Sequence, residues 1–239
     1  MIGADMTIEE WKAALQEAGI PCSAKMEQQT VRYAEMLKEW NQKFNLTAVD
    51  EPEEVYEIHM LDSLLPLARV QVAGRVCDVG SGAGFPGMVW AIARDDLEVV
   101  LLEPTGKRCT FLNAVKEELG LDHVTVVNRR AEDCRMFREG FDTVTARAVA
   151  NLSVLSELCV PLVKAGGSFV SLKGSKGAQE LSEAAYALKV LGCNDPQLLS
   201  YQLPSGEGRT LIVCEKTSAT PSKYPRPFGT IKHSPLKEK

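Results

Sequence analysis

The glycine-rich segment that begins at Gly80 constrains the fold more than any other part of the sequence. An apolar run at residues 76–79 contains one acid, Asp78, and leads directly into Gly-Ser-Gly-Ala-Gly-Phe-Pro-Gly at residues 80–87. Glycines let the backbone turn sharply and approach a ligand closely. We therefore expect a strand, a glycine loop and a helix starting near Pro86, at the sheet edge where cofactors bind.

Short apolar runs alternate with helical patterns from residue 75 onward. The runs cover residues 75–79, 98–103, 123–128, 141–146 and 168–173, and the longer helical patterns cover 107–119, 152–163 and 178–191. This alternation is typical of a mainly parallel sheet with helices on both faces. Two last runs, 197–203 and 210–216, are joined by a connection too short for a crossover helix, so we expect them to pair antiparallel.

The first 72 residues are predicted to be helical. Thr7 and Glu10 have the spacing of a capping box at the start of a first helix, and Gly19 suits its end. A second helix is expected at 23–41. Pro52 suits the first turn of a third helix. We thus predict three parts: an N-terminal helical extension (1–72), a Rossmann-like α/β domain with a mostly parallel sheet and an antiparallel last strand (73–217), and a basic flexible tail (218–239).

Charge is distributed unevenly along this acidic chain of net charge −5. Residues 1–72 carry six Lys or Arg against 13 Asp or Glu, a net of −7, whereas residues 218–239 carry five against one, a net of +4. An acidic protein repels polyanions on average, so binding to nucleic acid would require local basic patches. The tail is one such patch.

Cysteine usage and hydropathy indicate the compartment. The seven cysteines are scattered and form no Cys-x-x-Cys pair, which favours buried thiols in a reducing environment over a disulfide frame or a zinc site. Apolar runs are far shorter than the roughly 20 residues of a membrane span, and residues 1–5 do not resemble a signal peptide. We expect a soluble, cytoplasmic protein without a bound metal.

The spacing of the glycines distinguishes between cofactors. A G-x-G-x-x-G dinucleotide pattern fails when counted from Gly80, because the sixth residue is Phe85; it matches from Gly82, but too far past the strand. The pattern from Asp78 instead resembles the S-adenosylmethionine (SAM) loop of Rossmann-like methyltransferases. There Asp78 would accept hydrogen bonds from the methionine ammonium group, directly or through water, beside the backbone of Gly80 and Gly82.

Three positions at later strand ends extend this candidate site. Glu103 ends the second strand, 21 residues after Gly82, where an acid accepts hydrogen bonds from ribose hydroxyls. Ala131-Glu132 follows the third strand, where adenine is usually held. Arg147 ends the fourth strand and suits a salt bridge, a substrate clamp or a part of the cofactor site.

Nearly the whole chain resembles the glucose-inhibited division protein B family. The matching stretches are Trp40-Asn41-x-x-Phe44-Asn45-Leu46-Thr47, His59-x-x-Asp62-Ser63-Leu64, residues 78–87, Glu103 with Lys107-Arg108-x-x-Phe111-Leu112, Arg130-Ala131-Glu132, residues 141–148, Leu172-Lys173-Gly174 and Tyr224-Pro225-Arg226. Two details differ from the family pattern, Pro104 after Glu103 and Phe228 before Gly229.

The resemblance implies an enzyme that uses SAM, yields S-adenosyl-L-homocysteine and methylates N7 of a guanine in bacterial 16S ribosomal RNA. It implies a cofactor site of Gly80, Phe85, Glu103, Ala131, Glu132 and Arg147. The Phe85 ring would lie near the sulfonium or adenine, or else cap the core under the loop. The partner would be 16S ribosomal RNA or the small subunit. We expect a monomer, although no sequence feature fixes the oligomeric state.

N7 of guanine carries an exposed lone pair and needs no deprotonation. We therefore name no catalytic base and expect catalysis by positioning, with Arg147 and Lys173 as positioning candidates. His59 and Asp62 lie one helical turn apart. They suit either a catalytic dyad or a hydrogen bond that packs a helix, and we favour the second.

RNA contacts are expected around the mouth of the sheet. Asn45 and Thr47 lie in a loop between helices, where they would meet a base or cap a helix. Cations near strand ends form a predicted rim, namely Lys107, Arg108, Arg129, Arg130, Lys173 and Lys176. Arg226 and its neighbours interleave cations with aromatic rings, which is either a pattern that single-stranded RNA contacts use or that of a disordered tail that adds solubility.

Three other functions remain compatible with the sequence. The acidic composition slightly favours a methyltransferase for a protein or a small molecule. A dinucleotide-dependent oxidoreductase is disfavoured by the glycine spacing. A non-catalytic RNA-binding or assembly factor that keeps the cofactor fold is a third class, because no single residue proves turnover.

Overall fold

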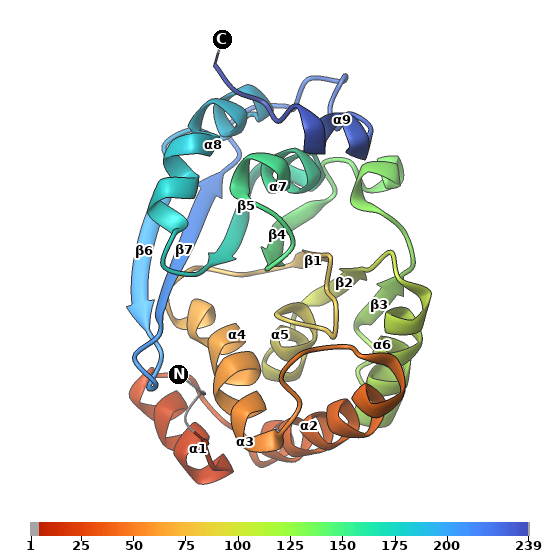
Figure 1. Cartoon of the computed structure of the whole chain (residues 1–239), viewed down its shortest axis with the longest axis vertical. Coiled ribbons are helices and arrows are strands. Elements are labelled where there is room, and N and C mark those ends of the chain that lie inside the picture. Colours follow the sequence, from red (N-terminus) through yellow and green to blue (C-terminus); the bar gives the residue numbers. More distant parts are fainter. Residues whose placement is uncertain (1–4, 239) are drawn as a thin grey trace.

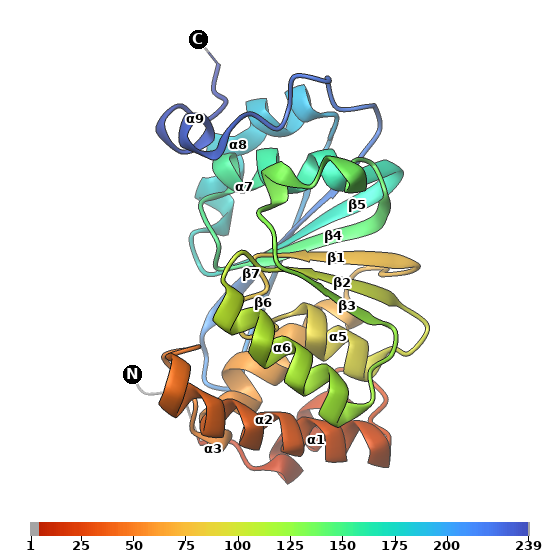
Figure 2. The same ribbon diagram turned by 90° about the vertical axis from the view of Figure 1, so that its right-hand side faces the viewer.

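The computed structural model describes residues 5–238. Residues 1–4 and 239, which belong to the predicted N-terminal extension and tail, lie outside the described residues. A central sheet separates two layers of helices, with α1 to α6 on one face and α7 to α9 on the other (Figures 1 and 2).

The sheet has seven strands in the order β3-β2-β1-β4-β5-β7-β6. The strands are β1 (Arg75–Val79), β2 (Glu98–Leu102), β3 (Val124–Val127), β4 (Phe141–Arg147), β5 (Val163–Lys173), β6 (Gln197–Gln202) and β7 (Gly208–Glu215). Strands β1 to β5 pair in parallel, and β7 pairs antiparallel with both β5 and β6. The predicted α/β class, with a mostly parallel sheet and an antiparallel last strand, is confirmed.

The helices are α1 (Ile8–Glu17), α2 (Ala24–Phe44), α3 (Pro52–Val55), α4 (Asp62–Leu64), α5 (Gly87–Ala93), α6 (Gly106–Leu119), α7 (Leu152–Cys159), α8 (Gly177–Leu191) and α9 (Phe228–His233). The predicted capping box is present, since Glu10 N–H donates to Thr7 Oγ1 (3.2 Å) and Thr7 N–H donates to Glu10 Oε2 (2.8 Å). The third predicted helix is not one regular α-helix. A π-helical segment, Tyr56–Leu61, interrupts it between α3 and α4.

Alternation along the strands divides the core into two clusters. Val76, Val99 and Leu101 face the layer that contains α1, α2, α5 and α6, whereas Cys77 and Val100 face the layer that contains α7, α8 and α9. All five side chains are at most 1% exposed. Burial on both faces explains why these strands are continuous apolar runs.

Helix α2 supports the glycine loop from below. The Gln29 side chain donates to the carbonyl of Leu119 at the end of α6 (2.7 Å), and the Tyr33 hydroxyl donates to the carbonyl of Ala83 within the loop. A Cβ at Gly84 would overlap the Tyr33 hydroxyl. The N-terminal helices thus set the shape of the loop.

The prediction of a flexible tail is wrong for the described residues 218–238. Tyr224 and Ile231 are buried, and α9 joins the core cluster of α7 and α8. Arg226 forms a two-pronged ion pair with Glu157 on α7, through Nε–Oε1 (2.8 Å) and Nη2–Oε2 (2.7 Å). Composition suggested disorder, but a few apolar side chains and one buried acid are enough to fix this segment.

The Glu157 side chain is fully buried, so Arg226 neutralises a charge that water does not reach. We expect Arg226→Ala to lower the free energy of unfolding by about 3 kcal/mol, because removing one partner leaves an uncompensated buried charge. The midpoint of thermal unfolding should fall by about 6–12 °C. Lys232→Ala, which removes an exposed cation from the same segment, is the matched control and should leave the midpoint unchanged. Equal midpoints for both variants would show that the Arg226–Glu157 ion pair does not stabilise the fold.

Candidate functional site

The glycine loop leaves β1 at the carboxyl edge of the sheet. Gly80 N–H donates to the carbonyl of Leu102 at the end of β2 (2.8 Å), which ties the loop to the neighbouring strand. Gly80 has a φ of +71°, and a Cβ there would lie 2.7 Å from Cγ2 of Val149. Only glycine satisfies both conditions at this position.

Asp78 lies under the loop with its side chain fully buried. Its Oδ2 accepts the N–H of Gly87 (2.8 Å), whereas Oδ1 has no hydrogen-bond partner in the described part of the chain. Burial raises the pKa of Asp78 to about 7. A buried acceptor without a partner is costly, so Oδ1 suits a donor that arrives with a ligand, such as an ammonium group.

Glu103 is 1% exposed and faces the loop from the end of β2. Its Oε2 accepts the N–H of Gly82 (2.9 Å) and its Oε1 accepts the N–H of Thr105 (2.8 Å). Each carboxylate oxygen can accept a further hydrogen bond. A Cβ at Gly82 would meet no atom closer than 3.9 Å, so the protein leaves free space at Gly82, whose N–H binds Glu103.

Ala131 and Glu132 lie in a 3₁₀ turn (Ala131–Asp133) directly after β3. Ala131 is buried, and both residues line a cavity of about 280 Å³ that Lys223 and Tyr224 close from the C-terminal segment. The turn lies at the same edge of the sheet as Asp78 and Glu103, since β1, β2 and β3 are parallel neighbours.

Phe85 is buried among protein groups. Its ring stacks on His59 (centroids 4.5 Å apart) and on Tyr33 (5.5 Å), and the Arg147 guanidinium lies 5.2 Å from its centroid. These contacts correspond to the second role considered for Phe85, a cap on the core beneath the loop. Contact with a cofactor stays a prediction.

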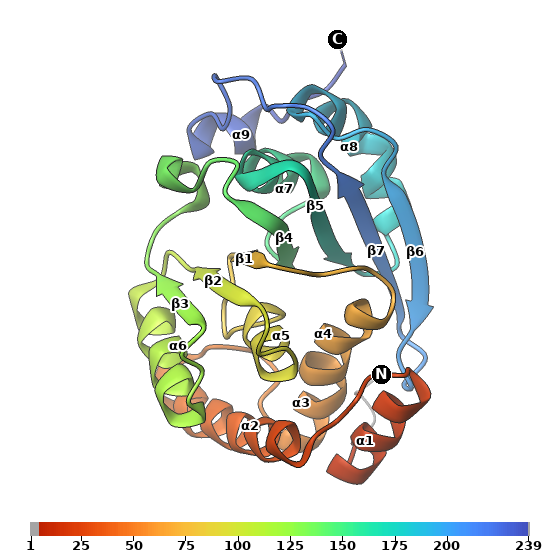
Figure 3. The same cartoon turned by 180° about the vertical axis from the view of Figure 1, so that it is seen from behind.

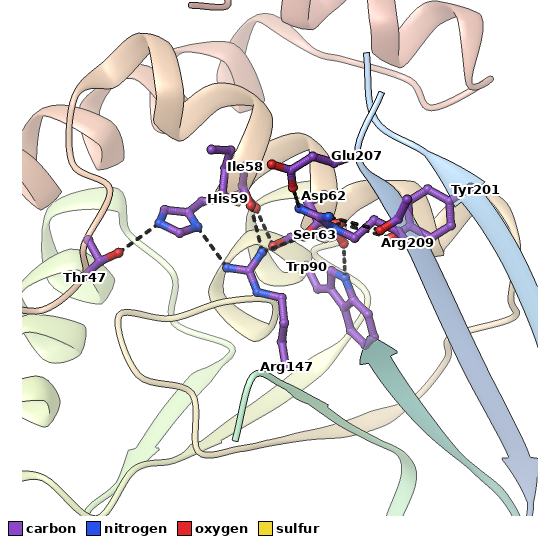
Figure 4. Close-up of polar contacts among 11 residues, drawn as sticks. Thr47, Ile58, His59, Asp62, Ser63, Trp90, Arg147, Tyr201, Glu207 and Arg209 are labelled. Atoms are coloured by element: carbon purple, nitrogen blue, oxygen red, sulfur yellow. Dashed lines mark hydrogen bonds and ion pairs between the residues drawn. The ribbon is translucent and has the colours of Figure 1, made fainter. Parts of the chain in front are cut away.

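Arg147 joins the end of β4 to the π-helical segment (Figure 4). Its Nη1 donates to the carbonyl of Ile58 (3.0 Å) and to Oδ2 of Asp62 (3.2 Å), and its Nη2 lies 3.1 Å from Nδ1 of His59. Among the three roles that the sequence left open, the structure shows the salt bridge.

His59 and Asp62 do not bond to each other; each bonds to Arg147. Both side chains therefore make hydrogen bonds that pack this helical segment against the sheet, the role that we favoured, and they form no dyad. Because a guanidinium only donates, Nδ1 accepts and the ring proton is assigned to Nε2, which faces Thr47 Oγ1 at 3.1 Å. Burial and the charge of Arg147 lower the pKa of His59 to about 3, so the ring is neutral at physiological pH.

Asp62 also binds the β6–β7 hairpin, whose turn lies beside the N-terminal helices (Figure 3). Its Oδ1 accepts from the Tyr201 hydroxyl (3.1 Å) and from Arg209 Nε (3.2 Å). Ser205 N–H donates to Glu57 Oε1 (2.6 Å) in the same region. The sequence carried no signal for these contacts, because Tyr201 and Arg209 lie 139 and 147 residues from Asp62.

A cleft of about 570 Å³ opens beside this network, between the ends of β4 and β5. Its walls contain polar and charged groups from five parts of the chain, among them His59, Asp62, Arg147, Asn151, Lys173, Glu180 and Arg209. Val149 also lines the cleft and would contact a Cβ at Gly80. The cleft therefore adjoins the glycine loop.

Two of the predicted RNA contacts are engaged by the protein itself. Lys173 Nζ donates to the carbonyl of Ala150 (2.6 Å) and pairs with Glu180 (2.8 Å), and its side chain is 7% exposed. Lys173 is therefore a cleft residue and not part of an exposed rim. Arg226 is held by Glu157, which corrects its assignment to a free RNA-binding tail.

The other predicted RNA contacts lie at the surface. Asn45 is exposed and ends α2 in the left-handed conformation, whereas the Thr47 hydroxyl bonds to His59. Lys107 is exposed and donates to the carbonyl of Phe44 (2.7 Å). Arg130 is exposed, with its guanidinium 5.2 Å from the Phe228 ring centroid.

Residues 5–238 contain no group of three or more His, Cys, Asp or Glu placed to bind a metal ion. None of the helices described there combines the length and the hydrophobicity of a membrane span.

The fold is also found in a solved methyltransferase structure. The chain superposes on a geranyl diphosphate C-methyltransferase from Streptomyces coelicolor, in complex with Mg²⁺, geranyl diphosphate and S-adenosyl-L-homocysteine, with a TM-score of 0.53 and 16% identity. The match covers 82% of this chain and all of that chain. At this identity the similarity shows the fold alone.

Comparison of amino-acid sequences identifies the family, which the shared fold alone does not. The chain is 44% identical to a ribosomal RNA small subunit methyltransferase G from Staphylococcus epidermidis, over 98% of this chain and 100% of the relative. It is 47% identical to the protein of that name from Staphylococcus saprophyticus, over 94% and 96%. A family model described as GidB, rRNA small subunit methyltransferase G, matches residues 26–207. The chain therefore belongs to the GidB family.

Proposed function

We propose that this protein transfers the methyl group of SAM to N7 of a guanine in bacterial 16S ribosomal RNA. The protein is a SAM-dependent methyltransferase of the GidB family. The observation that supports this substrate most strongly is identity of 44–47% over nearly the full chain to relatives named for the small-subunit RNA. The guanine and its N7 atom come from the resemblance found in the sequence.

The residues at the glycine loop fit the cofactor. The unpartnered Oδ1 of Asp78 would accept from its ammonium group, and Glu103 would accept from its ribose hydroxyls. Gly82 would leave room for its backbone contacts, and Gly80, with its positive φ, would form the tight turn beside it. Phe85, Ala131, Glu132 and Arg147 complete the proposed cofactor site.

Catalysis in this site would rest on positioning. SAM supplies a methyl group on a positively charged sulfur, which is already an activated electrophile. The chain contributes a fixed loop, a cleft that adjoins it and a neutral His59 whose pKa of about 3 leaves it unprotonated. Holding the reacting atoms in line is worth up to about 7–11 kcal/mol, and N7 needs no base.

The exposed groups near the loop are proposed to contact RNA. Lys107, Arg129 and Arg130 follow β2 and β3 at the carboxyl edge and are exposed, and Asn45 ends α2 in the same region, since Lys107 bonds to its neighbour Phe44. Single-stranded loops are the usual targets of sequence-specific RNA binding. These groups would orient such a loop toward the cleft.

The test is methylation of small ribosomal subunits and of their naked RNA with isotope-labelled SAM, followed by nuclease mapping and mass spectrometry. We expect one labelled guanine per RNA, with the methyl group on N7. Label on protein, or none on either RNA substrate while SAM still binds, would favour a different methyltransferase or a non-catalytic assembly factor.

Glu103→Gln tests the cofactor site. We expect the affinity for SAM to fall by about 1–3 kcal/mol, because a charged acceptor for the ribose is lost. Calorimetry measures the affinity, with thermal unfolding as a check on the fold. Glu98→Gln, at the exposed opposite end of β2, is the control and should bind SAM normally. Tighter binding of NAD than of SAM by the wild-type protein would rule out the glycine loop as a SAM site.

His59→Gln tests the absence of a base. Because the pKa of His59 lies near 3, the ring stays neutral as the pH falls from 8 to 5.5. At saturating SAM, the transfer rate of wild type should therefore show no titration that belongs to His59. Loss of an ionisation between pH 6 and 7 in His59→Gln would reveal a base at this position.

A further inference from the structure

We propose that Glu180 binds the N1–H and N2–H edge of the target guanine and thereby determines which base is methylated. This inference rests on the proposed function, and it concerns the cleft beside the glycine loop. Glu180 lies in the first turn of α8, and it lines that cleft.

One oxygen of Glu180 is bound and the other is free. Oε2 accepts the N–H of Leu152 (2.8 Å) and pairs with Lys173 Nζ (2.8 Å), which fix the carboxylate between α7 and β5. No hydrogen bond from a described residue reaches Oε1. The side chain is 24% exposed and lines the cleft, so a ligand in the cleft would contact this carboxylate.

The other acid that lines the cleft is nearly buried and has a protein donor on each of its oxygens. Asp62 is 4% exposed and accepts from three donors, Arg147 on Oδ2 and both Tyr201 and Arg209 on Oδ1. Its two oxygens thus join β4, β6 and β7 in the wall of the cleft. Of the two acids that line the cleft, Glu180 is the one with an oxygen that receives no hydrogen bond from a described residue.

The cleft lies next to the glycine loop, so an RNA base bound in the cleft would lie close to the cofactor site. Val149 lines it and lies against Gly80, and Arg147 lines it and lies over Phe85. Its volume of about 570 Å³ is within the range of small-molecule sites, about 300–1,000 Å³. A single base turned out of an RNA loop would fit.

Guanine offers two adjacent donors, N1–H and one hydrogen of the N2 amino group, which a carboxylate can accept. Adenine presents an acceptor at N1 and lacks the N2 amino group. During transfer the N7 lone pair forms the new bond to carbon, the carbon–sulfur bond pair stays on sulfur, and the positive charge passes to the purine. A carboxylate on the opposite edge then binds the transition state more strongly than the ground state.

The experiment compares guanine with inosine, which lacks the N2 amino group. Once the methylated guanine has been mapped, small-subunit RNA is ligated with guanine or inosine at that position and assembled into subunits. Wild type, Glu180→Gln and Glu183→Gln are assayed for kcat/KM on both, and for SAM affinity. Glu183, exposed on the same helix, is the matched control.

We expect wild type and Glu183→Gln to prefer guanine by about 10- to 100-fold, the effect of one hydrogen bond to a charged group. In Glu180→Gln this preference should shrink to a few-fold at most, while SAM affinity stays unchanged. A purely structural role would lower both rates equally and leave the preference intact.

The inference is overturned if Glu180→Gln keeps the full preference, or if wild type methylates inosine as well as guanine. Should Glu180→Gln fail to fold, Glu180→Asp keeps the charge but withdraws it from the base, and it must lose the preference. Wild type that methylates neither RNA contradicts the proposed function itself, which is a different outcome from an unchanged preference.

Discussion

The guanidinium of Arg147 holds together the parts of the chain that form the candidate site. From the end of β4 it bonds to the Ile58 carbonyl and the His59 imidazole of the π-helical segment, and to the Asp62 carboxylate at the start of α4. Asp62 in turn accepts hydrogen bonds from Tyr201 on β6 and Arg209 on β7, which links these strands to the same network. The N-terminal helices, the parallel sheet and the terminal hairpin therefore meet at one nearly buried ion pair, with 14% and 6% exposed side chains.

This arrangement explains why His59 is unsuited to proton transfer. A protonated imidazole would lie beside a guanidinium that has little access to water, and both burial and that charge lower its pKa. Neutral His59 instead accepts a hydrogen bond from Arg147 and forms a second one with the Thr47 hydroxyl. The π-helical turn that carries it places the Ile58 carbonyl, His59 and Asp62 around one guanidinium, and π-helical turns are frequent at functional sites.

Four carboxylates near the sheet edge have different surroundings and hence different roles. Asp62 accepts hydrogen bonds from three side chains and stabilises the wall of the cleft. Glu103 accepts two backbone N–H groups and shapes the loop. Asp78 keeps one buried oxygen without a partner, and Glu180 keeps one at the cleft surface. Unused acceptors of this kind indicate where a ligand supplies the donors.

The sequence by itself determined the order of strands and helices, the capping box at Thr7, the glycine loop and the acid at Glu103. These features are local: each follows from side-chain periodicity or from backbone geometry within a few residues. Only the tertiary structure decided the partners of Arg147, the pairing of Arg226 with Glu157, and the burial of Lys173. These contacts join residues that lie far apart along the chain, and a cation has the same local pattern whether it faces water or a buried acid. The charge pattern therefore suggested a mobile, RNA-binding tail, whereas folding brought one fully buried acid, Glu157, against it.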